Sequence, residues 1–229
     1  MAHSGASSHW LRSTNTVSVG SNVNPFLNAY SIHCWVRSSV APNQGSVRAA
    51  MNIMGDGFTG PNNQNPETTL YWDHTGAGFP KSAVQRRADQ SYDKAALTSS
   101  PSIDTWYAFG QSFDGSNLKV WFGGTNETTA ASAASQNKSV WMAALAESLS
   151  DGTIQSQFSN GQIAEVAFWT AALNADEFNA LAKGFRPTRI RPASLFAYLP
   201  LVRATIDLRG TPWNEMNSPT VTDHPRVLG

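Results

Sequence analysis

An apolar run that passes directly into a helical pattern constrains this chain more than any other feature. In the segment 161–169 (GQIAEVAFW), every residue from Ile163 onward except Glu165 is apolar, and a helical pattern begins within a few residues of its end. Asn174 can cap a helix, and Glu177, three residues later, completes a capping box. Gly184 can end the helix. We therefore predict a buried strand followed at once by one short helix.

Short strands separated by turn residues dominate the remainder of the chain. Apolar residues alternate with other residues at 32–36 and 118–122, and Asp114-Gly115 supplies a hairpin turn before the second of these segments. Further strands are predicted at 10–19, 49–54, 68–72, 106–113 and 195–201, and a loop or weak edge strand at 128–135. This spacing favours an all-β sandwich of two sheets over alternating strands and helices.

The composition narrows the classes of partner. Charged residues make up 14% of the chain and the formal net charge is zero, against roughly 25% charged residues in an average protein. A nucleic-acid-binding protein usually carries a basic footprint, and no apolar run approaches the ~18 residues of a membrane helix. We therefore predict that the protein binds neither nucleic acid nor a membrane. A surface of Ser, Thr, Asn, Gln and Gly suits sugars or other subunits, and equally a weakly charged β protein with no special role.

Three segments together carry a family resemblance: residues 30–36 (YSIHCWV), 105–124 with the Asp-Gly hairpin, and 161–182 with the closing strand and helix. They resemble the laminin-G-like branch of the concanavalin A-like lectin/glucanase superfamily. The resemblance implies a concanavalin A-like jelly-roll β-sandwich with one short helix. We place this domain at residues 1–204, with its core at about 10–202, and an extended C-terminal arm at 205–229.

Two later segments, 191–202 and 222–227, resemble the tails of jelly-roll proteins encoded by tailed bacteriophages. That resemblance implies a non-enzymatic virion surface protein, a capsid decoration or cement protein that contacts capsid or other virion subunits. The N-terminus lacks a basic region and an apolar core, so we expect synthesis in the host cytoplasm without a signal peptide. The alternative is a carbohydrate-binding module, free or tail-associated, that recognises a host surface glycan. Assembly into a homo-oligomer is a further alternative.

The motifs of catalysis are missing from the sequence. Glycoside hydrolases of the superfamily place several carboxylates on one strand, whereas Glu165 stands alone in its strand. The segment from Gly110 to Gly115 has the wrong spacing for a nucleophile elbow, and the five histidines form no zinc-ligand pair. We predict that the protein is not an enzyme.

No cofactor is predicted, with bound calcium as the alternative. The closing strand of the family often reads Gly-x-Ile-Asp-Glu-Val, and Ala164 stands at the position of its Asp. Asp56 and Asp151 could each coordinate an ion, although both lie in Asp-Gly pairs that more often form turns.

Aromatic and basic residues supply the candidate binding groups. We expect Trp72, Asp73 and His74 to form an exposed cluster on which a sugar ring could stack. Strand tryptophans are expected in or beside the core (Trp35, Trp106, Trp121, Trp169), which leaves Trp141 and Trp213 more open. Arg186, Arg189 and Arg191, with Lys183, would dock on an acidic partner surface or simply be solvated charges.

Overall fold

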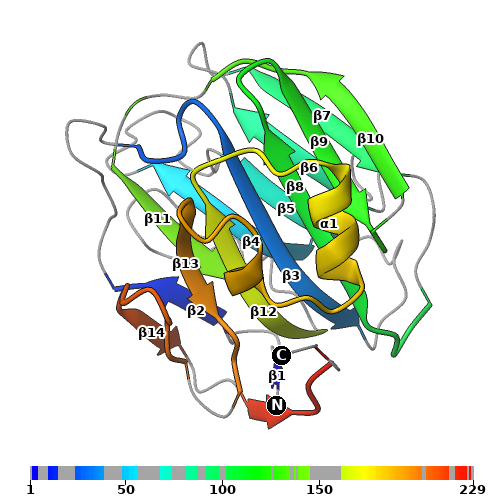
Figure 1. Ribbon diagram of the computed structural model, residues 1–229, viewed down its shortest axis with the longest axis vertical. Helices are drawn as coiled ribbons and strands as arrows, with labels where there is room; N and C mark the ends of the chain where they lie inside the picture. The colour runs from blue at the N-terminus through cyan, green and yellow to red at the C-terminus, as the bar shows by residue number, and fades with distance from the viewer. Residues whose placement is uncertain are drawn as a thin grey trace.

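Two antiparallel β-sheets pack face to face in the computed structural model (Figure 1), as predicted. The structure describes residues 2–4, 10–14, 24–38, 48–55, 68–73, 81–86, 91–97, 102–124, 126–134, 137, 139–144, 161–202, 205–216, 220–225 and 227. Within these residues, eight strands form the first sheet: β10 (Asn126–Ala131), β9 (Asn117–Phe122), β8 (Tyr107–Phe113), β3 (Tyr30–Ser38), β12 (Gly161–Trp169), β1 (Ala2–Ser4) and β15 (Thr220–Thr222) in spatial order, with β13 (Leu195–Leu199) also on β12. Seven described strands form the second sheet: β14 (Trp213–Met216), β2 (Trp10–Ser13), β11 (Val140–Ala144), β4 (Arg48–Gly55), β5 (Thr68–Asp73), β6 (Lys81–Arg86) and β7 (Tyr92–Leu97).

The main core lies between the two sheets. Alternate residues of β3, including Ile32, Cys34 and Val36, point into it and are fully buried. Burial raises the pKa of the Cys34 thiol, which is a free cysteine. The period-2 pattern in the sequence therefore identified the inward face of this strand.

A second apolar cluster covers the outer face of the first sheet. The helix α1 (Ala175–Ala182) lies across that face (Figure 1) and buries Phe178 and Leu181 against it. The Phe178 ring stacks on Trp121 with centroids 5.0 Å apart. Gly110 of β8 allows this approach, because a Cβ there would lie 2.4 Å from Phe178 Cε1. The cluster also contains Trp169 and Tyr198, so the outer face is a packed surface beside α1 and the short 3-10 helix η2 (Pro187–Arg189).

The start of α1 follows the predicted capping box. The Asn174 side chain accepts a hydrogen bond from the Glu177 backbone N–H at 3.0 Å, and the Glu177 carboxylate accepts one from the Asn174 N–H at 2.8 Å. Gly184 follows the helix with φ of +90°, the left-handed conformation that glycine tolerates best. Local residues therefore set both ends of α1.

Other elements add to or refine the predictions. The strands β1, β6, β7 and β11 were not predicted, and residues 128–131 belong to the edge strand β10. Of the strand predicted at 10–19, residues 10–13 are β2 and residues 15–19 lie outside the described residues. The C-terminal segment supplies β14 to the second sheet and β15 to the first, while a domain boundary at residue 204 stays a prediction. Among the described residues, no helix has the length and apolar character needed to cross a membrane.

Candidate functional site

Glu165 lies at an irregularity in the middle of β12. The register between β12 and β3 shifts between Ala164 and Ala167. On its other edge, β12 pairs with β1 up to Ile163 and with β13 from Val166. Glu165 has a φ of +52°; such a conformation costs a non-glycine residue about 1–3 kcal/mol and persists only where the surrounding structure holds it. The change of strand partner thus turns one acidic side chain out of the regular alternation.

Both carboxylate oxygens of Glu165 have partners from elsewhere in the chain. The Tyr198 hydroxyl of β13 donates to Oε2 at 2.5 Å. The Nε2 atom of His224, just beyond β15, lies 3.2 Å from Oε1. Glu165 is only 1% exposed, and a buried carboxylate is tolerated only with such compensation. The three side chains form what we call the Glu165 cluster.

The surroundings of His224 favour its protonated ring. Its Nδ1 lies 2.7 Å from the Pro225 carbonyl oxygen, and its Nε2 lies 2.9 Å from the Pro200 carbonyl oxygen. A neutral imidazole can donate from only one nitrogen, whereas the protonated ring donates from both. Burial disfavours the charged ring, but the hydrogen bonds to Glu165 and to the two carbonyls outweigh it and raise the pKa of His224.

The surroundings of Tyr198 favour its neutral phenol. Burial is the main cause that raises the pKa of Tyr198, and the charge and hydrogen bond of Glu165 add to it. The positive charge of Arg186 opposes the shift, which places that guanidinium within electrostatic reach of the Tyr198 hydroxyl.

The Glu165 cluster lies in a pocket of about 530 Å³, which we call the outer-face pocket. Its polar lining consists of Glu165, Arg186, Thr188, Tyr198 and His224. Its apolar lining consists of Pro200, Val202, Leu208, Pro225 and Val227. Val202 and Leu208 are more than half exposed, so the apolar wall is open to a ligand.

A second depression, of about 490 Å³, uses several of its polar groups for hydrogen bonds within the protein. It is lined in part by Ser194 and Arg209. The Arg209 Nε donates to the Leu195 carbonyl at 2.9 Å, and the Ser194 hydroxyl donates to the Arg191 carbonyl at 3.1 Å. The outer-face pocket is the stronger candidate, because the buried Glu165 cluster meets an exposed apolar wall there.

The prediction of an exposed aromatic cluster is wrong for Trp72, its main member. Trp72 is 1% exposed and packs between the sheets, with Phe109 and Phe122 at centroid distances of 6.0 and 5.9 Å. It points inward from β5 and cannot stack on a sugar. The side chain of Asp73 and all of His74 lie outside the described residues.

The other two tryptophans predicted to be open are partly covered. The Arg12 guanidinium lies over Trp141, 4.4 Å from the ring centroid. Trp213 packs on Phe168 and donates to Asp207 at 3.3 Å. Packing within the fold therefore accounts for both rings.

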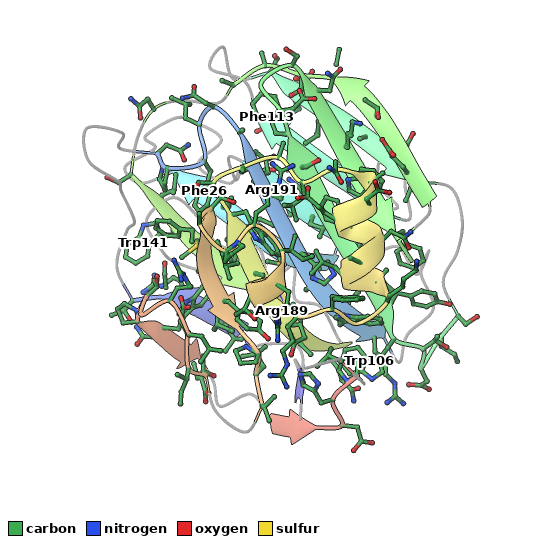
Figure 2. All side chains as sticks on the ribbon, in the orientation of Figure 1. Phe26, Trp106, Phe113, Trp141, Arg189 and Arg191 are labelled. Atoms are coloured by element: carbon green, nitrogen blue, oxygen red, sulfur yellow. The ribbon has the colours of Figure 1, made fainter. Side chains whose placement is uncertain are left out.

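The three arginines predicted to contact a partner have different surroundings. Arg186 lines the outer-face pocket, and Arg191 pairs with Glu177 at 2.5 Å beside α1. Arg189 is exposed on η2. Figure 2 shows Arg189 and Arg191 at separate places on the face that carries α1. Docking of these residues on a protein partner stays a prediction.

The metal candidates Asp56 and Asp151 lie outside the described residues. Among the residues that the structure does describe, no three His, Cys, Asp or Glu side chains come together as ligands for an ion. Ala164, at the family's Asp position, is buried and apolar.

Sequence reasoning missed the pocket because its members come from four separated segments. Glu165 was noticed only as a solitary acid, although an acidic residue inside an otherwise apolar strand was itself a signal of a special site. Tyr198, Thr188 and His224 carry no local pattern that connects them to Glu165.

Comparisons with known proteins agree with the architecture. The family model described as the concanavalin A-like lectin/glucanases superfamily matches residues 11–179. No curated protein matches the chain. A heptameric SAP-like pentraxin from Limulus polyphemus superposes with a TM-score of 0.61 at 12% identity, over 97% of this chain and 94% of the pentraxin.

A second solved structure, titled "a putative carbohydrate binding protein" from Bacteroides ovatus, gives a TM-score of 0.64 at 14% identity. The alignment covers 100% of this chain and 61% of that protein. Identities this low show the fold alone, and the resemblance to phage-encoded versions stays a prediction. The family model, by contrast, spans most of the sequence, and the chain belongs to the concanavalin A-like lectin/glucanases superfamily.

Proposed function

We propose that this protein is a non-enzymatic carbohydrate-binding module and that a saccharide binds in the outer-face pocket. The observation that carries the proposal is the pocket itself, which joins an exposed apolar wall to a polar floor. Its volume of about 530 Å³ lies within the range of small-molecule sites, roughly 300–1,000 Å³. The family, which includes lectins, and the similar fold of the Bacteroides ovatus protein described as carbohydrate binding are in keeping with the proposal.

The lining matches the two-sided chemistry of a sugar ring. A pyranose has apolar C–H faces and a rim of hydroxyl groups. Val202 and Leu208 offer apolar surface to the faces, while Arg186 and Thr188 offer hydrogen-bonding groups to the rim. Few charges need to lose water when a neutral ring enters such a pocket.

The geometry of the pocket does not favour glycoside hydrolysis. That reaction requires two carboxyl groups, about 5–9.5 Å apart, one of them able to donate a proton. Of the described residues that line the outer-face pocket, only Glu165 carries a carboxylate. Both of its oxygens are engaged, by Tyr198 and His224. We therefore assign the pocket to binding.

A glycan array probed with the purified protein tests the proposal. Val202→Trp should fill the mouth of the pocket and lower binding at least tenfold. Ile206→Trp is the matched control, because Ile206 is exposed in the same C-terminal segment but does not line the pocket. The proposal fails if the wild-type protein retains no glycan, or if Val202→Trp binds as well as the control.

The capsid-decoration hypothesis stays a prediction, because neither the fold nor the pocket identifies a virion partner. Co-purification with intact phage particles at a fixed stoichiometry would support it, and recovery in the lysate supernatant alone would contradict it.

A further inference from the structure

The polar groups on the floor of the outer-face pocket already satisfy one another. Glu165 accepts from the Tyr198 hydroxyl and lies against the His224 ring, and both nitrogens of that ring face oxygen atoms. The Tyr198 hydroxyl donates its only hydrogen to Glu165. A ligand in the pocket would therefore find neither a free carboxylate nor a free donor on the floor.

The unengaged groups are at the rim, on the segment of η2. Arg186 and Thr188 both line the pocket, and neither side chain makes a hydrogen bond or ion pair with another described residue. A guanidinium offers five donors and no acceptor, and a threonine hydroxyl offers one donor and two acceptor lone pairs. The groups left for a ligand are thus mostly donors, which favours a ligand rich in acceptors.

The charges in the pocket also favour a ligand rich in acceptors. The Glu165 carboxylate already has the His224 ring as its partner, with Nε2 3.2 Å from Oε1. Among the described lining residues, Arg186 then remains as a positive charge without an ion-pair partner. A neutral ligand would leave this charge without a partner, whereas an anionic ligand would pair with it.

We propose that the outer-face pocket is specific for an acidic saccharide, in which a hexuronic acid carboxylate pairs with the Arg186 guanidinium. This inference rests on the carbohydrate-binding function proposed above. The planar fork of the guanidinium matches a carboxylate through two parallel hydrogen bonds. Thr188 lies two residues further along the same segment and can donate to a neighbouring ring hydroxyl, while Val202 and Leu208 contact the ring face.

The expected discrimination is large enough to measure. A neutral hexose replaces the carboxylate by a hydroxymethyl group, which offers one neutral hydrogen bond in place of two charge-assisted ones. Hydrogen bonds to charged groups are stronger than neutral ones by enough to change affinity roughly tenfold to a hundredfold. The preference should weaken as salt is added, because the rim is open to solvent.

Isothermal titration of the full chain with matched oligosaccharides tests the inference. The pairs are glucuronate and glucose, galacturonate and galactose, and mannuronate and mannose oligomers of equal length. We expect the acidic member of at least one pair to bind at least about tenfold more tightly. Arg186→Gln should abolish the difference and Arg186→Lys should keep part of it. Arg189→Gln should leave it unchanged, because Arg189 lies on η2 without lining the pocket.

The outcomes separate this inference from the proposed function. If the acidic and neutral members bind equally and Val202→Trp weakens both, the acidic specificity is wrong and the carbohydrate site stands. If an acidic preference survives Arg186→Gln, the assignment of the carboxylate to Arg186 is wrong. If neither the oligosaccharides nor any glycan on the array binds, both proposals are wrong.

Discussion

Glu165→Gln should destabilise the protein at acid pH much more than at alkaline pH. The amide keeps the size of the carboxylate and can still accept from Tyr198, but it cannot pair with a protonated His224. A hydrogen bond to a charged group contributes about 1.5–3 kcal/mol and a neutral one about 1 kcal/mol. Exchanging the two charge-assisted contacts for weaker ones therefore costs about 2 kcal/mol. For a chain of 229 residues this lowers Tm by about 6 °C.

The pH dependence follows from the direction of the His224 shift. The folded-state pKa of His224 lies above its unfolded value of about 6.5. The stabilisation by the pair is therefore complete below about pH 6.5 and is lost as the pH rises through the raised pKa. Above that pKa the wild-type protein keeps a buried carboxylate beside a neutral ring, so its advantage over Glu165→Gln should shrink to the part contributed by the Tyr198 hydrogen bond.

Urea denaturation followed by tryptophan fluorescence at about pH 5.5 and about pH 9 measures this difference. Glu177→Gln is the matched control, since its carboxylate pairs with Arg191 at the surface and arginine does not titrate in this range. Its effect should be small and the same at both pH values. Equal losses for Glu165→Gln at the two pH values, or no loss at the lower one, would refute the reasoning.

Three further changes test the packing of the first sheet and of α1. Burial lowers the pKa of His33 to about 3. The stabilisation that depends on the neutral ring is complete above about pH 6.5 and should fall by up to about 1.4 kcal/mol per pH unit as the pH drops towards 3. In urea titrations, His33→Leu should remove this part of the pH dependence of stability, and an unchanged pH dependence would contradict the prediction. Gly110→Ala places a methyl group 2.4 Å from Phe178 and should lower the free energy of unfolding by about 2 kcal/mol. Gly123 has a φ of +63° and open space around it, so Gly123→Ala should lower it by only about 1 kcal/mol. Similar losses of Tm in the two variants would argue against the close contact. Asn174→Ala removes the capping box of α1 and should lower the free energy of unfolding by about 1 kcal/mol, with no change expected if the cap does not form.

The parts of the fold with local causes were predictable from the sequence. The capping box of α1 needs only Asn174 and Glu177, and both of its hydrogen bonds are present. The hairpin between β8 and β9 needs only Asp114 and Gly115: the Asp114 carboxylate accepts from the Asn117 N–H at 2.8 Å, and Gly115 has a φ of +97°. Such features depend on neighbours in the chain, so a single sequence contains them.

The parts that depend on packing between distant segments were not predictable. Tyr71 and Trp72 occupy adjacent positions of β5, and both are buried, at 6% and 1% exposure. Alternation distinguishes the two faces of a strand only when one face meets solvent, so the pattern could not show that Trp72 lies in the core. The Glu165 cluster is likewise assembled by pairing of β12 with β13 and by the placement of His224 after β15.

The most direct test of the account is to locate a bound saccharide on the protein. Backbone amide chemical shifts of the full chain, recorded during titration with the tightest glycan from the array, show where it binds. We predict that the changes centre on Thr188, Val202 and Leu208, which line the outer-face pocket. Changes centred on the second sheet, with these three amides unaffected, would contradict the account.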